Sequence, residues 1–394
     1  MNDIQRAIVA GHLCLDIFPS LDHLPRGQFS AIFQPGRLVQ AGAARFATGG
    51  AVSNTGLALH RLGVPTWLVA KVGDDPFGQI VRAIVAERDP RLTEGIVTDP
   101  AEMTSYTVII NPPGVDRIFL HCPGANDAFG PDDVSDELLA RAALFHFGYP
   151  PIMRRMYEHG GLALVELLRR ARASGATTSL DMTLPDPSSD SGRADWRAIL
   201  AAALPYADLF LPSVEELLFM LHRDRYEQLS ALGDLAKQIT PDLLSALSAE
   251  LLGLGAKIVA IKLGERGLYL RTGSRAAMEG LGRARPANWE LWIERELWSP
   301  CFRASVVGTT GAGDTTIAGF LSALLRGLDP YDSVAIAVAV GACSVEAPDA
   351  LGGVRSWDDT LARIAGGWAQ LPLQLSAPGW DWNERHQLWE RRSR

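Results

Sequence analysis

Apolar residues along the chain form short continuous runs separated by segments with a helical repeat. The short runs predict strands at residues 7–10, 66–72, 144–148, 177–182, 208–211 and 257–263. Apolar residues three and four positions apart predict helices at residues 161–173, 196–203, 214–221 and 241–254. Strands that alternate with helices over such a length indicate an α/β fold. We expect one mostly parallel central sheet, covered by helices on both faces.

Two segments near the N-terminus have a different pattern. Residues 28–46 are rich in Gly and Gln, with scattered apolar residues, and residues 106–110 and 117–121 flank a turn of Asn-Pro-Pro-Gly. Apolar runs on both sides of such a turn are typical of a hairpin. We therefore expect a small sheet that projects from the main body.

The segment 306–328 carries the clearest chemical signal. It begins with β-branched residues, passes through a turn of small residues and continues as a helix with one apolar face. This places Gly311, Ala312 and Gly313 at a helix N-terminus, where free amides and the helix dipole attract an anion. Asp314 follows directly and can take a proton from a nucleophile beside that anion. Such a site suits phosphoryl transfer to an alcohol, although an ordinary glycine turn with a capping Asp has the same pattern.

Further polar residues are predicted near strand and helix ends. Asp16 follows the first strand, where its carboxylate could bind substrate hydroxyls or simply be solvated. Gly49 and Gly50 allow close approach of a ligand to the backbone, and Asn54 can both donate and accept hydrogen bonds; an ordinary glycine-rich turn is the alternative. Ligands of parallel sheets bind beyond the carboxyl ends of the strands. Asp16, Asp181 and the glycine turn are all predicted at such ends, which favours a single site.

Two other segments allow both a structural and a functional interpretation. Ser213 and Glu216 fit the S-x-x-E capping box, and Glu216 could also orient a magnesium-bound water. Residues 262–270 predict a strand, a tight turn and a second strand. That turn is either a plain hairpin turn or faces a nucleotide.

Composition and charge narrow the class of protein. The chain has 394 residues, of which 47% are hydrophobic and 21% charged, as in a globular protein with a large core. A net charge of −8 gives no overall attraction to nucleic acid or to anionic membranes, and we expect neither as a partner. We see no membrane-spanning run and no signal peptide. The cysteines are far apart and form no CxxC pair, so we expect reduced thiols in a cytoplasmic protein: Cys14, Cys122, Cys301 and Cys343.

Together these motifs resemble those of the PfkB/ribokinase-like carbohydrate kinase family, over residues 6–356. Gly49-Gly50 followed by Asn54 is similar to the first family signature. Residues 308–314, Gly-Thr-Thr-Gly-Ala-Gly-Asp, are similar to the second, D-T-x-G-A-G-D. Secondary motifs match in the same order at residues 73–78, 124–126 and 262–267.

The resemblance implies a three-layer α/β/α sandwich with a small β-sheet lid over the sugar. It also implies transfer of the γ-phosphate of ATP to a hydroxyl, with Mg²⁺. Asp314 would be the general base, and Gly311, Ala312 and Gly313 would form the anion hole. The implied substrate-binding residues are Asp16, Gly49, Gly50, Asn54 and Asn126. Those implied around the nucleotide are Lys262, Gly264, Gly267 and Thr309, with Glu216 acting on the magnesium.

Two positions depart from the family pattern. Gly308 replaces the first Asp of the second signature, which in potassium-activated relatives helps to hold the monovalent cation, so activation by potassium is doubtful. Ser213 replaces the Asn of the family's N-x-x-E motif, which weakens the magnesium assignment without removing Glu216. A nucleoside kinase of the same fold and a non-catalytic nucleotide- or sugar-binding regulatory protein remain alternatives.

The C-terminal part of the chain is rich in tryptophan. Eight of the ten tryptophans lie at or after Trp289. We expect a kinase domain at residues 1–356, with lid strands within 12–48 and 103–123 and an insertion at 276–303. Residues 357–394 form a Trp-rich extension. Because tryptophan buries a large area, we expect the insertion and the extension to pack on the main domain or on the second subunit of a homodimer. An exposed flexible tail is the alternative for the extension.

Overall fold

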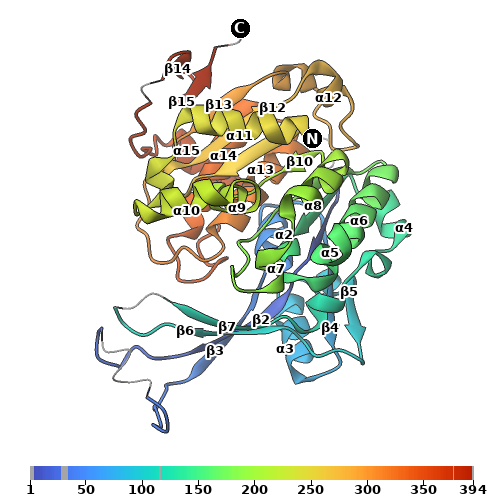
Figure 1. The fold of residues 1–394 in the computed structure, drawn as a ribbon, viewed down its shortest axis with the longest axis vertical. Coiled ribbons are helices and arrows are strands. Elements are labelled where there is room, and N and C mark those ends of the chain that lie inside the picture. Colours follow the sequence, from blue (N-terminus) through green and yellow to red (C-terminus); the bar gives the residue numbers. More distant parts are fainter. Residues whose placement is uncertain (1–3, 28–33, 115–116, 376, 393–394) are drawn as a thin grey trace.

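The computed structural model describes residues 4–27, 34–114, 117–375 and 377–392. Within these residues the chain forms an 11-stranded main sheet and a separate four-stranded sheet. The smaller sheet extends away from the main body as an arm (Figure 1). The predicted α/β fold with a small second sheet is confirmed.

The main sheet is parallel over most of its width and antiparallel at one edge. Its parallel strands, in sheet order, are β5 (Ile96–Asp99), β4 (Thr66–Gly73), β1 (Ala7–Gly11), β8 (Leu144–Gly148), β9 (Thr177–Leu180), β10 (Leu209–Phe210) and β11 (Ile258–Lys262). The antiparallel strands that follow are β12 (Leu268–Thr272), β13 (Glu296–Ser299), β15 (Leu388–Arg391) and β14 (Trp380–Asn383). In the centre, Val9 of β1 aligns with Leu68 on one side and His146 on the other.

Two hydrophobic cores lie on opposite faces of this sheet. Ala7 and Val9 contribute to one core and Ile8 and Ala10 to the other, because successive side chains of a strand point to opposite faces. The first core is covered by α2 (Ala51–Arg61), α3 (Pro76–Ala86), α12 (Arg275–Glu279), α13 (Ala312–Leu325), α14 (Pro330–Ser344) and α15 (Trp357–Ala365). The second is covered by α4 (Asp136–Arg141), α5 (Arg154–Tyr157), α6 (Leu162–Ala173), α8 (Trp196–Ala203), α9 (Val214–Leu221), α10 (Arg223–Ala231) and α11 (Pro241–Gly253). A short helix, α7 (Asp190–Arg193), precedes α8.

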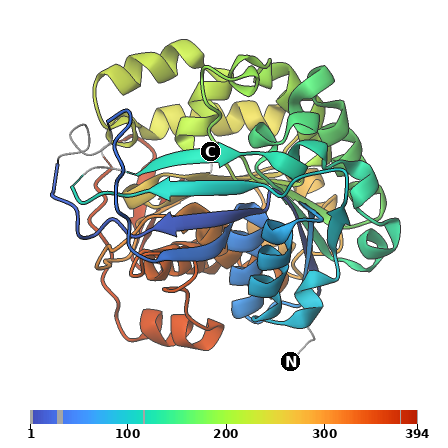
Figure 2. The same ribbon diagram turned by 90° about the horizontal axis from the view of Figure 1, so that it is seen from below.

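The smaller sheet lies below the main body in Figure 1, and the view from below shows its strands running side by side (Figure 2). Its order is β3 (Ala44–Gly49), β2 (Cys14–Pro19), β6 (Tyr106–Ile110) and β7 (Ile118–Cys122). The hairpin predicted around the Asn-Pro-Pro-Gly turn is confirmed as β6 and β7. Of the strands predicted within residues 28–46, the structure shows β3 from Ala44 onward, and residues 28–33 lie outside the described residues.

Two predictions about strand ends are wrong. The first main strand ends at Gly11, and Asp16 lies inside β2 of the smaller sheet. Gly11 has a φ of 124°, and a Cβ there would overlap the Gly148 carbonyl, so the chain turns away at this glycine. The turn before Asp314 does not follow a strand either, since the described residues between β13 and α13 contain only a single isolated bridge. The two β-branched residues in this segment, Val306 and Val307, are exposed by 66% and 63%, so they do not pack in a core as strand residues would.

The C-terminal extension continues the main sheet. β15 pairs antiparallel with β13, and β14 with β15. Trp380 is buried, with its ring 6.2 Å from that of Tyr269. Beneath this hairpin, the buried carboxylate of Glu296 accepts hydrogen bonds from Tyr269 Oη at 2.7 Å and from Arg391 Nη1 at 3.2 Å. Residues 380–391 therefore pack on the main sheet. None of the helices that the structure describes combines the length and the apolar character that a membrane crossing requires.

Candidate active site

Asp314 is buried in the first turn of α13, with 2% of its surface exposed. Gly311 caps this helix with a φ of 70°, and a Cβ at that position would overlap the Ala350 side chain. Glycine is therefore required here, and it opens a helix N-terminus whose first amides lack intrahelical acceptors. The amide of Ala312 donates to the Thr309 carbonyl at 3.3 Å. The predicted glycine turn at the start of a helix is confirmed.

Three side chains from two other elements hold the carboxylate of Asp314. Tyr149 Oη lies 2.8 Å from Oδ1 and 2.7 Å from Oδ2, and Asn54 Nδ2 donates to Oδ2 at 3.0 Å. Thr55 Oγ1 donates to Oδ1 at 3.5 Å. Burial raises the pKa of Asp314, while the positive charge of Lys262 and these hydrogen bonds oppose the rise. The group is thus a carboxylate with increased basicity in a polar, water-poor setting.

Tyr149 is a site residue that sequence reasoning missed. It follows β8 directly and has left-handed backbone angles, with a φ of 70°. This turn aims its side chain at Asp314, although the two residues are 165 positions apart in the chain. Its position after a predicted parallel strand was the available signal, because that is where ligands of such sheets bind.

Lys262 lies against the first turn of α13. Its Nζ is 2.6 Å from Asp181 Oδ1, and a Cβ at Gly313 would be 3.7 Å from Nζ. Burial lowers the pKa of Lys262, but the nearby carboxylates of Asp181 and Glu216 outweigh this effect and the pKa is raised. Burial also raises the pKa of Asp181, against the opposing charge of Lys262. The charged lysine is therefore beside the predicted anion hole.

Glu216 forms the predicted capping box of α9. The Ser213 amide donates to Glu216 Oε2 at 2.6 Å, and Ser213 Oγ accepts from the Glu216 amide at 3.3 Å. The same carboxylate raises the pKa of Asp181, so it lies close enough for the two charges to interact. Oδ2 of Asp181 is buried and has no hydrogen-bond partner among the described residues.

Among those residues no group of three or more His, Cys, Asp or Glu side chains forms a ready metal site. Magnesium bound with a nucleotide takes one or two protein carboxylates, and phosphates and water complete its shell. The unpaired oxygen of Asp181, with Glu216 nearby, fits that kind of site.

Asp16 and Gly49 lie on the neighbouring strands β2 and β3 of the smaller sheet. Asp16 is 9% exposed, and a Cβ at Gly49 would overlap its carboxylate. Cys14 Sγ donates to Asp16 Oδ1 at 3.4 Å. Burial raises the pKa of Asp16 to about 6. The smaller sheet thus contributes a buried carboxylate whose desolvation is only partly offset by hydrogen bonds from its neighbours.

His12 is a second site residue absent from the predictions. It is buried, and neither ring nitrogen has a hydrogen-bond partner within the described chain. Its ring lies 5.2 Å from that of His121 and 6.2 Å from that of Tyr149. Gly50, with a φ of 89°, leaves room for it, because a Cβ there would overlap Nδ1. Burial, then the charge of His121, lowers the pKa of His12 well below its usual value, so the ring is neutral and can both donate and accept hydrogen bonds.

Some predicted residues have other contacts. The Asn126 side chain binds the Leu13 backbone, accepting from its amide at 3.1 Å and donating to its carbonyl at 3.0 Å. Gly264 begins the turn after β11, and Gly267 ends it, where a Cβ would overlap the Ser299 carbonyl. None of these contacts brings the residues to Asp314.

The smaller sheet also contacts the loop before α13. Arg117, next to β7, donates from Nη2 to Thr309 Oγ1 at 3.3 Å and from Nη1 to Thr310 Oγ1. The arm and the glycine turn are therefore in contact, although they are 192 positions apart in the chain.

Comparison with known proteins identifies the class. The model of the pfkB family carbohydrate kinases matches residues 20–356. The chain belongs to this family, whose enzymes are phosphotransferases with an alcohol group as acceptor.

Its relatives include fructokinase-1 of Zea mays, 26% identical over 73% of this chain and 77% of the relative. The ATP-dependent ribose-1-phosphate kinase of Halopiger xanaduensis is 26% identical over 86% of this chain and 90% of the relative.

Solved structures agree on the fold. Ribokinase of Arabidopsis thaliana, complexed with ribose and ATP, has a TM-score of 0.68 at 20% identity and covers 91% of this chain and 98% of its own. Fructokinase of Xylella fastidiosa with bound ATP also has a TM-score of 0.68 at 20% identity, with 92% and 99% covered. The predicted family and fold are confirmed.

Proposed function

We propose that this protein is an ATP-dependent kinase that phosphorylates a hydroxyl of a sugar or sugar-like molecule. Asp314 acts as the general base, and the amides of Gly311, Ala312 and Gly313 form the anion hole. One observation carries the proposal: a buried, basic carboxylate, a charged lysine and a glycine-lined helix N-terminus meet within the first turn of α13.

The reaction follows from that arrangement. Asp314 removes the proton from the acceptor hydroxyl as its oxygen bonds to the γ-phosphorus, and the bond to the β-phosphate oxygen breaks to release ADP. The helix amides and Lys262 oppose the negative charge on the transferring group. Tyr149 and Asn54 keep the carboxylate oriented before the acceptor hydroxyl arrives.

The nucleotide lies on the side of β11. Lys262 ends this strand, Gly264 and Gly267 form the next turn, and Thr309 precedes the anion hole. The relatives crystallised with ATP support this cofactor. Asp181 and Glu216 would hold Mg²⁺, which supplies charge neutralisation for the phosphates when it is bound.

The acceptor lies between the lid and α2. Asp16, held against Gly49, binds acceptor hydroxyls, and Asn54 contacts the reacting hydroxyl together with Asp314. Gly50, at the start of α2, shapes this wall by leaving room for His12, and Asn126 supports the wall by fixing Leu13. The sugar names of the curated relatives support a carbohydrate as the acceptor.

The test is ADP formation by the full chain with MgATP and a panel of fructose, ribose, ribose 1-phosphate and nucleosides. ATP hydrolysis without acceptor is the control. We expect turnover that depends on one of the sugars. Turnover with nucleosides alone would reassign the acceptor, and no acceptor-dependent turnover at all would favour the regulatory protein.

A further inference from the structure

A large cavity opens at the amino ends of the parallel strands β1 and β4, away from Asp314. It has a volume of about 1500 Å³ and lies between the starts of β1 and β4, the ends of α2 and α13, and the start of α15. α13 contains 14 residues, which gives it a length of about 21 Å at 1.5 Å per residue. The cavity and the anion hole are at opposite ends of this helix, so they are separate sites.

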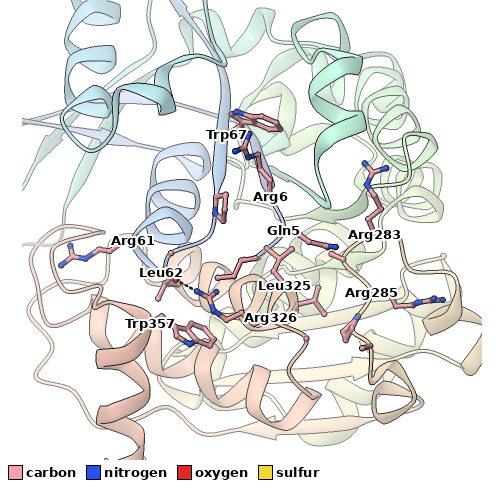
Figure 3. Close-up of a pocket in the computed structure, with 18 of the residues that line it drawn as sticks. Gln5, Arg6, Arg61, Leu62, Trp67, Arg283, Arg285, Leu325, Arg326 and Trp357 are labelled. Atoms are coloured by element: carbon pink, nitrogen blue, oxygen red, sulfur yellow. Dashed lines mark hydrogen bonds between the residues drawn. The ribbon is translucent and has the colours of Figure 1, made fainter. Parts of the chain in front are cut away.

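The cavity wall is strongly basic. Six arginines line it: Arg6, Arg61, Arg141, Arg283, Arg285 and Arg326. Figure 3 labels all of them except Arg141 and shows them spread around the cavity. Among the lining residues that the structure describes, Asp358 is the one carboxylate. Arg141 also forms an ion pair with Glu137, one helical turn away, with 3.6 Å between Nη1 and Oε1. This concentration of positive charge stands out in a chain with a net charge of −8.

Capping of helix ends explains part of this arrangement. Arg326 Nη2 donates to the Leu62 carbonyl at 2.6 Å, beyond the end of α2, and Arg283 Nε donates to the Ala142 carbonyl at 2.8 Å. The ends of the two longer helices, α2 and α13, contribute about half a negative charge each. These two ends, Asp358 and Glu137 together balance only part of the positive charge of the six guanidinium groups.

Three arginines are suited to binding a ligand. Arg6 and Arg141 lie over the Trp67 ring, with guanidinium carbons 4.0 and 5.1 Å from its centroid. The guanidinium group of Arg6 has no hydrogen bond or ion pair to any residue that the structure describes, although its backbone carbonyl accepts from the amides of Ala143 and Leu144. Arg285 uses one nitrogen on the Glu279 carbonyl, at 2.6 Å. Each of the three has donors left for an incoming anion.

We propose that this cavity binds a small molecule that carries two or more phosphate groups. Arginine is the side chain best suited to phosphate, because its planar fork can make paired, charge-assisted hydrogen bonds. A volume of about 1500 Å³ holds a nucleotide or a sugar bisphosphate with its water. The proposal does not depend on the chemistry at Asp314.

Calorimetry on the full chain tests the proposal and separates the two sources of phosphate. AMP-PNP with Mg²⁺ is titrated first. If the cavity takes a nucleotide, AMP-PNP binds at two sites per chain, the anion hole and the cavity. If AMP-PNP binds at one site, tripolyphosphate and fructose 1,6-bisphosphate are titrated into the AMP-PNP-saturated protein. The cavity variant is R6Q/R141Q/R285Q, and the matched control is Arg225→Gln, an exposed arginine of α10.

We expect one of these probes to bind the cavity in the wild type and in the Arg225→Gln variant. The cavity variant should bind it about tenfold more weakly or worse, because three charge-assisted donors are lost. Two results overturn the proposal. One is a wild type that binds AMP-PNP at no more than one site, with the same affinity in the cavity variant, and that binds neither of the other probes. The other is equal binding in the cavity variant, in which case the arginines serve only to cap helices.

Discussion

Replacing Tyr149 by Phe tests how the structure sets the basicity of Asp314. The phenol has one proton, so its contacts of 2.8 and 2.7 Å to the two carboxylate oxygens are one shared hydrogen bond. Phenylalanine keeps the ring beside His12 and removes only this donor. Asn54 still donates to the carboxylate, at 3.0 Å.

The size and sign of the effect follow from that bond. A hydrogen bond to a charged group contributes about 1.5–3 kcal/mol, and one pKa unit corresponds to about 1.4 kcal/mol. The bond favours the ionised form, so losing it raises the pKa of Asp314 by about 1–2 units. Burial already raises this pKa. Since the base must be ionised, the acid limb of the rate profile should move to higher pH by the same amount.

The assay is the pH dependence of kcat and kcat/KM for sugar-dependent ADP formation. Tyr157→Phe is the matched control, because Tyr157 packs on Trp196 at a ring distance of 6.4 Å and has no contact with Asp314. An acid limb that stays in place in Tyr149→Phe would refute the reasoning. So would an equal shift in the control.

Three further predictions concern stability and the lid. The pKa of Asp16 in the folded protein is about 6, above its ordinary 3.8. The wild type should therefore lose stability relative to Asp16→Asn as pH rises from about 4 to about 6, by up to about 3 kcal/mol. Urea unfolding at several pH values measures this difference in stability, and a difference that stays constant with pH would count against a buried carboxylate. Lys262→Met leaves the buried Asp181 without its ion-pair partner and should lower the free energy of unfolding by about 3–5 kcal/mol in the same assay. Adding Asp181→Asn should restore the stability but not kcat. A restored kcat would exclude a role for Lys262 in catalysis. Deleting residues 380–394 uncovers the edge of β13 and should lower the melting temperature; an unchanged temperature would show that the hairpin does not stabilise the domain.

Much of the fold is predictable because its signals are local. The buried runs of the central strands and the apolar repeats of their helices lie within single segments, so both types of element could be assigned. β13 to β15 were not predicted as strands. They are short, and among the strands that the structure describes Trp380–Asn383 pairs only with the neighbouring strand β15. This hairpin joins the main sheet through the pairing of β15 with the distant strand β13.

The site divides in the same way. The helix start at Gly311 and Asp314 could be predicted because a contiguous motif specifies a helix N-terminus. Tyr149 and His12 were missed because their roles depend on how the chain turns after β8 and β1, which involves a left-handed Tyr149 and the break at Gly11. That break also moves Asp16 into the lid. Asn54 was predicted to bind the sugar, and the structure adds a contact with Asp314 that only tertiary packing creates.

Asp314→Asn tests the central claim most directly. The substitution keeps the shape of the side chain and removes the base. We expect kcat for sugar phosphorylation to fall by about 10²–10⁴, while calorimetry shows ATP binding largely unchanged. A variant that phosphorylates the sugar at the wild-type rate would contradict the assignment of Asp314 as the base.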